Sequence, residues 1–383
     1  MRICIDARSL RDVPTSLGRY AADIVSHIAK LDRENEYIVV RRPSRHGPIA
    51  DQVNFREIFS PHDISSPQNI LAGARVINGL DADVYHSLYH FLPIGVRARR
   101  VVITLHDLIW VNHSYLADGR RWRQWVKGSL GSFGIRRAIA TADHIVAVSA
   151  STRQAALNHG VPADKVTAVL HGVASVWHSD NAEPAQFDLG HATDQDHAQQ
   201  DILAGLVERP FVFGLGNSLP YKNLPRLVRA FAQVAPDHPD LALVFAGRGE
   251  GNSALVRLAH QLGLSDRVLL AGQLSDEQIR VCFAHALFFA FPSLIEGFGL
   301  PVLEAMASGC PVLTSNCSSL GEVAGEDAVL ADPLDITAIG AGMERRHKHA
   351  ALRQRLAHQG RQRAAAFTWE DAAQRTIQLY KQL

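Results

Sequence analysis

The chain has 383 residues, and 39 Lys and Arg against 38 Asp and Glu give it a formal net charge of +1 at pH 7. Hydrophobic residues make up 47% of the sequence and charged residues 20%, which fits a globular protein with buried cores and excludes collagen-like, low-complexity and wholly disordered chains. At about 100–200 residues per domain, this length predicts two or three domains. No apolar run reaches the roughly 18 residues of a transmembrane helix, so we expect none.

The charge is unevenly distributed along the chain. Residues 1–175 hold 22 Lys and Arg and 15 Asp and Glu, whereas residues 176–208 hold seven acids and no Lys or Arg. The acidic stretch has few large apolar residues, a composition typical of a linker or a surface insertion. We therefore expect an N-terminal domain over 1–175, a linker over 176–208 and a C-terminal domain over 209–368, with a last helix over 369–383 that packs back on the first domain.

Short runs rich in Val, Ile and Phe alternate with amphipathic stretches in both halves. The runs are apolar on both faces, which is the pattern of central parallel strands. The predicted strands are Arg2–Asp6, Tyr37–Val40, Val84–His86, Val101–Leu105, His144–Val148, Val166–Leu170, Phe211–Gly214, Leu241–Ala246, Val268–Ala271, Leu287–Phe291, Pro311–Thr314 and Ala328–Leu330, and helices are predicted over Leu224–Val234, Asn252–Leu262, Asp276–Ala284 and Trp369–Leu383. This alternation predicts an α/β fold of two Rossmann-like, doubly wound domains that face a central cleft.

One segment of the C-terminal half combines a strand end, a glycine turn and a helix start. The predicted strand ends at Phe291, and Pro301 stands where a first helical residue belongs. Backbone N–H groups between them would face the crevice beyond the strand end and form an anion site suited to a phosphate. These groups belong to Gly297, Phe298, Gly299 and Leu300. Glu296 and Glu304 frame the site, and two carboxylates beside a phosphate fit a ligand that also offers hydroxyls, such as a sugar nucleotide.

This segment resembles the Glu-x7-Glu signature of glycosyltransferase family 4, whose members are retaining enzymes with the GT-B fold. Other segments resemble the family in the same order along the chain, namely Met1–Tyr20, Thr104–Leu108, Gly216–Leu224, Ala307–Val312 and Glu322–Gly325. The most similar branch is that of the mannosyltransferase B-like enzymes of bacterial O-antigen and exopolysaccharide assembly.

The resemblance implies a metal-independent hexosyltransferase that needs no cofactor. Its donor would be a nucleotide sugar, with GDP-mannose expected from the branch and dTDP-rhamnose and UDP-glucose left open. Its acceptor would be a saccharide or a polyprenyl-diphosphate-linked glycan of the bacterial surface. The family is thought to react by front-face retention, in which the departing phosphate oxygen accepts the acceptor's proton. A catalytically silent protein that binds a nucleotide sugar is the alternative from another class.

The resemblance also implies roles for single residues. Lys222 would neutralise the leaving diphosphate, and a lysine in a motif is notable because the chain has only six. Glu296 would bind hydroxyls of the donor sugar, and Glu304 would bind those of the ribose. At the end of a first-domain strand, His106 would contact the donor sugar or the developing positive charge, and Asp107 would orient His106 or the backbone.

Further donor contacts follow from the same motifs. Gly18 is expected in a loop after the first strand, where the missing Cβ lets the backbone approach the phosphates, although Ser16 replaces the second glycine of the family pattern. Tyr221 stands where the family often carries a basic residue, so one phosphate cation is missing. The other implied contacts are Asn217 and, in place of that cation, Arg248 at the phosphates, and Gln273 and Leu274 at the nucleobase.

Residues 120–137 combine arginines with apolar residues at helical spacing, namely Trp122, Trp125, Leu130 and Phe133. Two interpretations stay open. The helix either packs on a core and has a solvated basic face, or it lies at an interface and meets anionic lipid or a lipid-linked acceptor. We expect a cytoplasmic protein, because Asp6 comes too early for a signal peptide, with peripheral binding to the inner face of the plasma membrane under the second interpretation.

Three patterns argue against other classes of site. Asp81-Ala82-Asp83 spells the Asp-x-Asp of metal-dependent glycosyltransferases, but it precedes a strand, so we expect a capping or turn role. The histidines show no metal-ligand spacing, and the four scattered cysteines are expected to be buried, reduced thiols. No nucleic-acid-binding motif accompanies the arginines, so no nucleic acid is expected as a partner.

Overall fold

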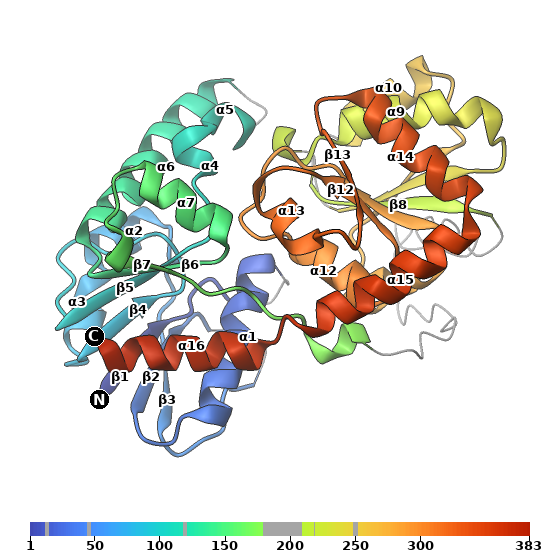
Figure 1. The fold of residues 1–383 in the computed structure, drawn as a ribbon. Helices are drawn as coiled ribbons and strands as arrows, with labels where there is room; N and C mark the ends of the chain where they lie inside the picture. Colours follow the sequence, from blue (N-terminus) through green and yellow to red (C-terminus); the bar gives the residue numbers. More distant parts are fainter. Residues whose placement is uncertain (12–14, 44–46, 118–120, 179–208, 218, 248–251) are drawn as a thin grey trace. The chain divides into compact units, whose positions relative to one another are not determined.

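The structure is a computed structural model that describes residues 1–11, 15–43, 47–117, 121–178, 209–217, 219–247 and 252–383. Most of the expected linker and Arg248 lie outside these residues. The chain divides into two compact units, the first of residues 1–115, 120–172 and 367–383 and the second of residues 116–119 and 173–366. Each unit is a parallel sheet flanked by helices (Figure 1).

The first unit contains a seven-stranded sheet with the order β3-β2-β1-β4-β5-β6-β7, in which all neighbours are parallel. The strands are β1 Arg2–Asp6, β2 Glu36–Arg41, β3 Phe55–Phe59, β4 Val84–Ser87, β5 Arg100–Leu105, β6 His144–Ala147 and β7 Val166–Ala168. The helices are α1 Ser16–Leu31, α2 Pro67–Ala72, α3 Ala74–Asn78, α4 Ile109–Asn112, α6 Arg121–Thr141, α7 Ala150–Asn158, α16 Trp369–Gln382 and the 3-10 turn η1 Ala163–Lys165. The short helix α5 Ser114–Ala117 begins in the first unit and ends in the second. The strand order reverses between β1 and β4, the kind of switch point at which doubly wound folds bind ligands.

Alternate residues of β1 contribute to two cores, one on each face of the first sheet. Ile3 and Ile5 are buried with residues of α1 and α16, whereas Cys4 is buried with residues of β5 and α6. The last helix, α16, lies against α1 (Figure 1), and its Trp369 and Tyr380 are buried in the first of these cores. The end of the chain therefore stabilises the unit that contains its beginning.

The second unit contains a six-stranded parallel sheet with the order β10-β9-β8-β11-β12-β13. The strands are β8 Phe211–Leu215, β9 Ala242–Ala246, β10 Val268–Gly272, β11 Phe288–Phe291, β12 Val312–Ser315 and β13 Val329–Ala331. The helices are α9 Leu224–Val234, α10 Asn252–Gln261, α11 Asp276–His285, α12 Leu300–Ala307, α13 Ser318–Ala324, α14 Ile336–Lys348 and α15 Ala350–Ala365, with 3-10 turns η2 Ser175–His178, η3 Pro220–Lys222 and η4 Ala235–Asp237. Its switch point lies between β8 and β11.

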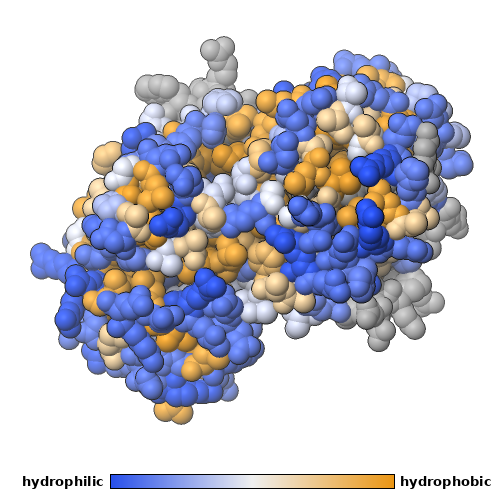
Figure 2. Space-filling view, in the orientation of Figure 1, coloured by the Kyte–Doolittle hydropathy of each residue, from blue (hydrophilic) through white to orange (hydrophobic). Residues whose placement is uncertain are grey.

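The second sheet is also covered on both faces. Leu227 and Phe231 of α9 and Met343 of α14 are buried against it in one core. Against the sheet strands, Phe283 of α11 packs with its ring centroid 5.6 Å from that of Phe213 and 5.2 Å from that of Phe289. On the side drawn in Figure 2, hydrophilic residues separate small groups of apolar ones, which is ordinary for folded proteins.

The predicted strands and helices are all present, with ends that differ by two residues or fewer. The sequence did not predict β3, because it is an edge strand that pairs only with β2 and carries Arg56 and Glu57 among partly exposed positions. The expected turn role of the Asp-x-Asp segment is confirmed, since Asp83 Oδ2 accepts the Arg2 N–H at 2.8 Å and Asp81 has a φ of 49°.

Two further expectations concern thiols and membrane spans. All four cysteines are free and three are buried, but Cys317 is partly exposed, so the expectation of burial is wrong there. Burial raises the pKa of the Cys282 thiol to about 12. Within the described ranges, no helix has the length and apolar character needed to cross a bilayer.

Buried histidines lie near the carboxyl ends of the central strands of the first sheet. The Nδ1 atom of His86 lies 2.6 Å from the Tyr380 hydroxyl, and its Nε2 lies 3.0 Å from Thr104 Oγ1. Burial lowers the pKa of His86 to about 3 and that of His90 to about 3. Burial likewise lowers the pKa of His106 to about 4, although its hydrogen bond to Leu88 opposes part of that shift. These rings are therefore neutral at pH 7.

The contact between α16 and β4 gives a direct test of how the end of the chain stabilises the first unit. Tyr380→Phe removes the hydroxyl next to His86 Nδ1 and leaves a buried nitrogen without that partner, which should lower the free energy of unfolding by about 1–3 kcal/mol. Urea unfolding of this variant is compared with that of Tyr115→Phe, where the ring is 60% exposed and no loss is expected. Equal stability of the two variants would contradict this prediction.

The buried histidines predict a loss of stability in acid. Because their folded-state pKa values lie below the ordinary value of about 6.5, the unfolded chain takes up protons that the folded chain cannot as the pH falls below 6.5. Stability should be fully present above about pH 6.5 and fall towards pH 4, by about 1.4 kcal/mol per pH unit for each such histidine. Hydrogen exchange of β4 and β5 amides at several pH values measures this loss.

His90→Phe should reduce the slope of the unfolding free energy against pH by the contribution of one histidine, because the phenylalanine ring cannot take up a proton. His62→Asn, at an exposed position of the same unit, serves as the control for the loss of a histidine elsewhere. An unchanged slope in His90→Phe would show that this histidine does not contribute to acid sensitivity.

Candidate active site

Two loops leave the second sheet at its switch point. Strands β8 and β11 are neighbours, with Phe288 paired to Val212 and Phe289 paired to Phe213. After β8 the chain turns into η3 and α9, and after β11 it turns into α12. The first loop carries Lys222 and the second carries Glu296. Ligands of doubly wound folds bind beyond the carboxyl ends of strands at such a point.

The structure brings Lys222 and Glu296 into direct contact. Lys222 Nζ donates a hydrogen bond to Glu296 Oε1 at 2.7 Å, and each side chain is 13% exposed. A pair so far removed from water needs good geometry to offset its desolvation, and a lone charge in this position would be unfavourable. The sequence identified both residues as donor contacts but did not predict that they bind one another.

Asn223 fixes the turn that carries Lys222. Its backbone is left-handed, with φ 61° and ψ 21°, a conformation that Asn adopts more readily than most residues. Its Nδ2 donates to the carbonyl oxygen of Pro292 at 2.9 Å and to that of Pro333 at 2.7 Å, and the side chain is buried. The turn is thereby tied to the loop after β11. Asn223 had no predicted role, although an Asn between a turn and a helix start is a signal for a left-handed residue.

Hydroxyl groups of β12 and of the start of α13 hold the loop after β11. Thr314 Oγ1 donates to the Phe291 carbonyl at 2.8 Å, and Ser315 Oγ donates to that of Ser293 at 2.6 Å. Glu296 is held through its backbone, because its N–H donates to Ser318 Oγ at 3.2 Å and its carbonyl accepts from Ser319 Oγ at 2.9 Å. The carboxylate of Glu296 is therefore presented by a loop whose backbone is fixed at several points, and sequence reasoning missed the two serines.

The start of α12 follows this loop as the sequence predicts. The helix begins at Leu300 with Pro301 in its first turn, and Gly299 caps it with φ 106°. A Cβ on Gly299 would lie 2.7 Å from Leu320 Cδ2, so both the backbone angle and the space require glycine. Glu304 is buried in this helix, and Phe298 and Leu300 are buried beside it.

Three adjacent strands end in glycines with positive φ, and the first of these, Gly216, lies beside the Lys222 side chain. Gly216 follows β8 with φ 149°, Gly247 follows β9 with φ 143°, and Gly272 ends β10 with φ 67°. The Gly247 N–H donates to the Gly272 carbonyl at 2.7 Å, and a Cβ on Gly247 would lie 2.1 Å from the Gly216 carbonyl oxygen. At the carboxyl ends of these three strands the backbone therefore carries no side chains, which leaves space for a phosphate or a base to approach closely.

The other predicted donor contacts also follow the carboxyl ends of these strands. Asn217 follows Gly216, and its Oδ1 accepts the Leu219 N–H at 3.3 Å, so the side chain shapes its own turn. Gln273 and Leu274 follow Gly272 at the end of β10, and Leu274 is buried. Arg248 would come next after Gly247 but lies outside the described residues. No group of three His, Cys, Asp or Glu side chains suited to hold a metal occurs in the part of the chain that the structure describes.

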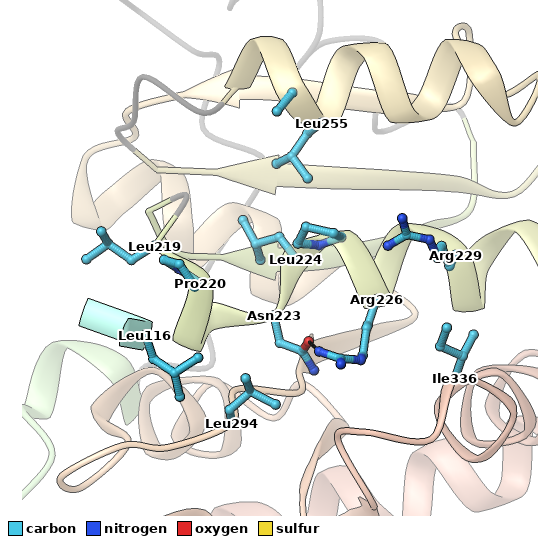
Figure 3. A pocket seen from close by; sticks show the side chains of 12 residues that line it. Leu116, Leu219, Pro220, Asn223, Leu224, Arg226, Arg229, Leu255, Leu294 and Ile336 are labelled. Atoms are coloured by element: carbon cyan, nitrogen blue, oxygen red, sulfur yellow. Dashed lines mark hydrogen bonds between the residues drawn. The ribbon is translucent and has the colours of Figure 1, made fainter. Parts of the chain in front are cut away.

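A pocket of about 580 Å³ lies beside the η3 turn and the start of α9 (Figure 3). Its lining includes Asn223, Leu224, Arg226, Leu255 and Leu294 but neither Lys222 nor Glu296. In Figure 3 the Arg226 side chain points to Asn223, whose Oδ1 accepts from Arg226 Nη1 at 2.9 Å. This pocket is mainly apolar, and of the residues that hold the Lys222 turn it includes Asn223.

In the first unit, His106 directly follows β5 and is buried. Its Nε2 lies 3.0 Å from the Leu88 carbonyl oxygen, so Nε2 is the protonated nitrogen of the neutral ring. Its ring centroid lies 4.9 Å from that of Tyr20 and 6.0 Å from that of His171. His90, which follows β4, lies 6.4 Å away and stacks on Tyr89. The sequence predicted only His106 of this ring cluster, because a scattered histidine gives no periodic signal.

The structure narrows the predicted role of Asp107 and corrects the predicted position of Gly18. Asp107 Oδ1 accepts the Ile109 N–H at 2.9 Å, so its carboxylate orients the backbone at the start of α4. Gly18 does not lie in a loop: it belongs to the first turn of α1, and its N–H donates to the side chain of the N-cap Thr15 at 3.0 Å. The prediction was wrong because Thr15 starts the helix early, and Ser16 then needs only a helical φ.

Residues 121–137 lie in α6, and the side chains of 121–127 are outside the described set. Ile135 and Ala138 face the core, whereas Leu130 and Phe133 are 68% and 66% exposed. The core-facing interpretation of the helix is therefore wrong for these last two residues.

Comparisons with known proteins agree with this architecture. The model described as Glycosyltransferase Family 4 matches residues 17–175, and the model described as Glycosyl transferases group 1 matches residues 198–363. O-antigen chain mannosyltransferase B of Escherichia coli is 27% identical over 408 residues, with 100% of both chains covered. Serotype-specific mannosyltransferase WbdA of Escherichia coli is 28% identical over 292 residues, which cover 74% of this chain and 34% of that protein.

Solved structures show the same fold over the whole chain. Sucrose-phosphate synthase from Thermosynechococcus elongatus has a TM-score of 0.73 at 20% identity and covers 100% of this chain and 98% of its own. Anabaena HepE, solved in complex with UDP and glucose, has a TM-score of 0.71 at 16% identity and covers 100% of both chains. These likenesses show the GT-B fold of two parallel-sheet α/β units. The two family models, which match residues 17–175 and 198–363, show that the chain is a glycosyltransferase and belongs to family 4.

Proposed function

We propose that this glycosyltransferase transfers a hexose from a nucleotide sugar to a bacterial surface glycan with retention at the anomeric carbon. The observation that carries the proposal is the contact between Lys222 and Glu296 at the switch point of the second sheet, 2.7 Å apart. An ammonium suits a diphosphate and a carboxylate suits sugar hydroxyls, so one place offers partners for both parts of a nucleotide sugar.

In the proposed reaction, the bond between the anomeric carbon and the phosphate oxygen breaks as the acceptor oxygen bonds to the same face. The acceptor's proton passes to the departing phosphate oxygen, so no carboxylate nucleophile is needed. Lys222 stabilises the negative charge that develops on the diphosphate, and this charge is neutralised without a metal. His106, neutral because burial lowers its pKa to about 4, acts as a polar contact to the donor sugar and not as a cation.

Mannose from GDP-mannose is the proposed donor. Its support is the similarity of this chain to two mannosyltransferases, O-antigen chain mannosyltransferase B and mannosyltransferase WbdA. Rhamnose from dTDP-rhamnose and glucose from UDP-glucose are the competing donors, and the UDP and glucose bound to HepE favour testing the second. The proposed acceptor is a saccharide or a polyprenyl-diphosphate-linked glycan, which would place the reaction at the inner face of the plasma membrane.

Lys222→Ala tests the proposed role of the cation. Loss of a charged contact to the diphosphate should remove about 1.5–3 kcal/mol of transition-state stabilisation. In a radiolabelled transfer assay, kcat/KM for the donor should therefore fall roughly ten- to 150-fold. Lys381→Ala is the matched control, because it removes an exposed pair with Glu34 whose oxygen lies 3.1 Å from Lys381 Nζ. A Lys222→Ala variant with the parent kcat/KM would contradict the role.

The exposed residues of α6 predict binding to an anionic surface. Phe133 and Leu130 are apolar and exposed, and Arg136 on the same helix is exposed as well. Leu130→Ser with Phe133→Ser should reduce co-sedimentation with vesicles that contain anionic lipid, whereas Leu71→Ser, exposed on α2, should not. If the parent protein stays in the supernatant at low salt, the membrane part of the proposal is wrong.

A further inference from the structure

The ammonium of Lys222 lies against more than a carboxylate. Its Nζ is 5.0 Å from the centroid of the Tyr221 ring and 4.8 Å from that of the Phe291 ring. Glu296 Oε1 is 2.7 Å from the same nitrogen. Two aromatic faces and one carboxylate therefore surround this cation, and both ring distances fall within the range in which a ring attracts an ammonium.

Tyr221, Phe291 and Glu296 form an ammonium cage, in which the ring of Phe291 and the backbone of Tyr221 and Glu296 are held by further contacts. Phe291 ends β11, is buried, and stacks on Phe289 with the ring centroids 5.5 Å apart. The Tyr221 carbonyl accepts the Leu294 N–H at 2.7 Å, which joins the turn before Lys222 to the loop of Glu296.

The stem of Lys222 is confined as well. A Cβ built on Gly216 would lie 3.3 Å from Lys222 Cδ and 3.4 Å from its Cγ, so the bare glycine leaves just enough space for the methylenes. A lysine stem has several rotatable bonds and loses entropy when it is ordered, so a site that orders it in advance binds an anion more tightly.

The rings and the carboxylate act differently on the cation. A carboxylate accepts one of the three ammonium N–H groups and cancels part of the positive charge. An aromatic face attracts the ammonium without accepting a conventional hydrogen bond and without a net charge, so the positive charge stays available to an incoming anion. Tyr221 can thus hold the ammonium without competing with a diphosphate.

We propose that Tyr221 is a positioning residue, whose ring holds the Lys222 ammonium in place for the diphosphate of the donor. This inference rests on the proposed function, in which Lys222 binds that diphosphate. It assigns the effect to the ring face and not to the phenol hydroxyl.

The first test compares Tyr221→Leu with Tyr221→Phe by calorimetric titration of GDP and GMP, and of UDP and UMP. Tyr221→Leu should weaken diphosphate binding by about three- to tenfold and leave monophosphate binding nearly unchanged, while Tyr221→Phe should keep the parent Kd. Tyr115→Leu, at an exposed tyrosine of the first unit, is the control for loss of a tyrosine elsewhere. Equal losses for mono- and diphosphate, or a loss in Tyr221→Phe, would overturn the inference.

The second test needs no nucleotide. The chain has six lysines, so Lys222 can be assigned in lysine-selective NMR spectra through its absence in Lys222→Arg. The ring faces should shift the Lys222 ε-methylene protons upfield, and Tyr221→Leu should reverse part of this shift while Tyr221→Phe keeps it. An unshifted signal in the parent protein would refute the cage. If the shift is present but no nucleotide binds, the proposed function fails and the cage stands.

Discussion

The contact between Lys222 and Glu296 is the interaction on which the candidate site of the second unit depends. Strands β8 and β11 pair side by side, yet their loops lead to different helices, α9 and α12. Opposite charges are placed on these two loops, and Lys222 and Glu296 meet at 2.7 Å where the loops part. Neither side chain has much access to water, so each depends on the other for compensation. A ligand that offers both a phosphate and hydroxyls can replace this contact with contacts of its own.

The surrounding residues keep these two loops in register. Asn223 ties the Lys222 turn to Pro292, while Ser318 and Ser319 hold the backbone of Glu296. These bonds join side chains and backbone groups of the protein itself, so they hold both loops in a defined conformation. Such preorganisation matters for a transferase, because charge that develops on the leaving diphosphate is stabilised best by groups that need not move.

The sequence predicted the strands and helices well where the pattern was strong. Central strands are continuous apolar runs, whereas β3 pairs on one side only, and its Arg56 and Glu57 conceal it. Lys222 and Glu296 were predicted because they stand in a dense motif, and Pro301 indicated the start of α12. The contact between Lys222 and Glu296 and the roles of Asn223 and the serines depend on residues far apart in sequence, which no local pattern reveals. Gly18 was assigned to a loop because the capping role of Thr15, which begins α1 at Ser16, was not recognised.

The central claim is that the second unit binds a nucleotide sugar through the Lys222 and Glu296 site. Thermal-shift titration of the whole chain with GDP-mannose, UDP-glucose, dTDP-rhamnose and an ADP-sugar tests it most directly, since a ligand that binds the folded state raises the melting temperature with concentration. We expect a saturable rise with one of these donors, GDP-mannose first, and we expect this rise to be lost in Lys222→Ala. The absence of any rise with all four, or a rise of equal size in Lys222→Ala, would contradict it.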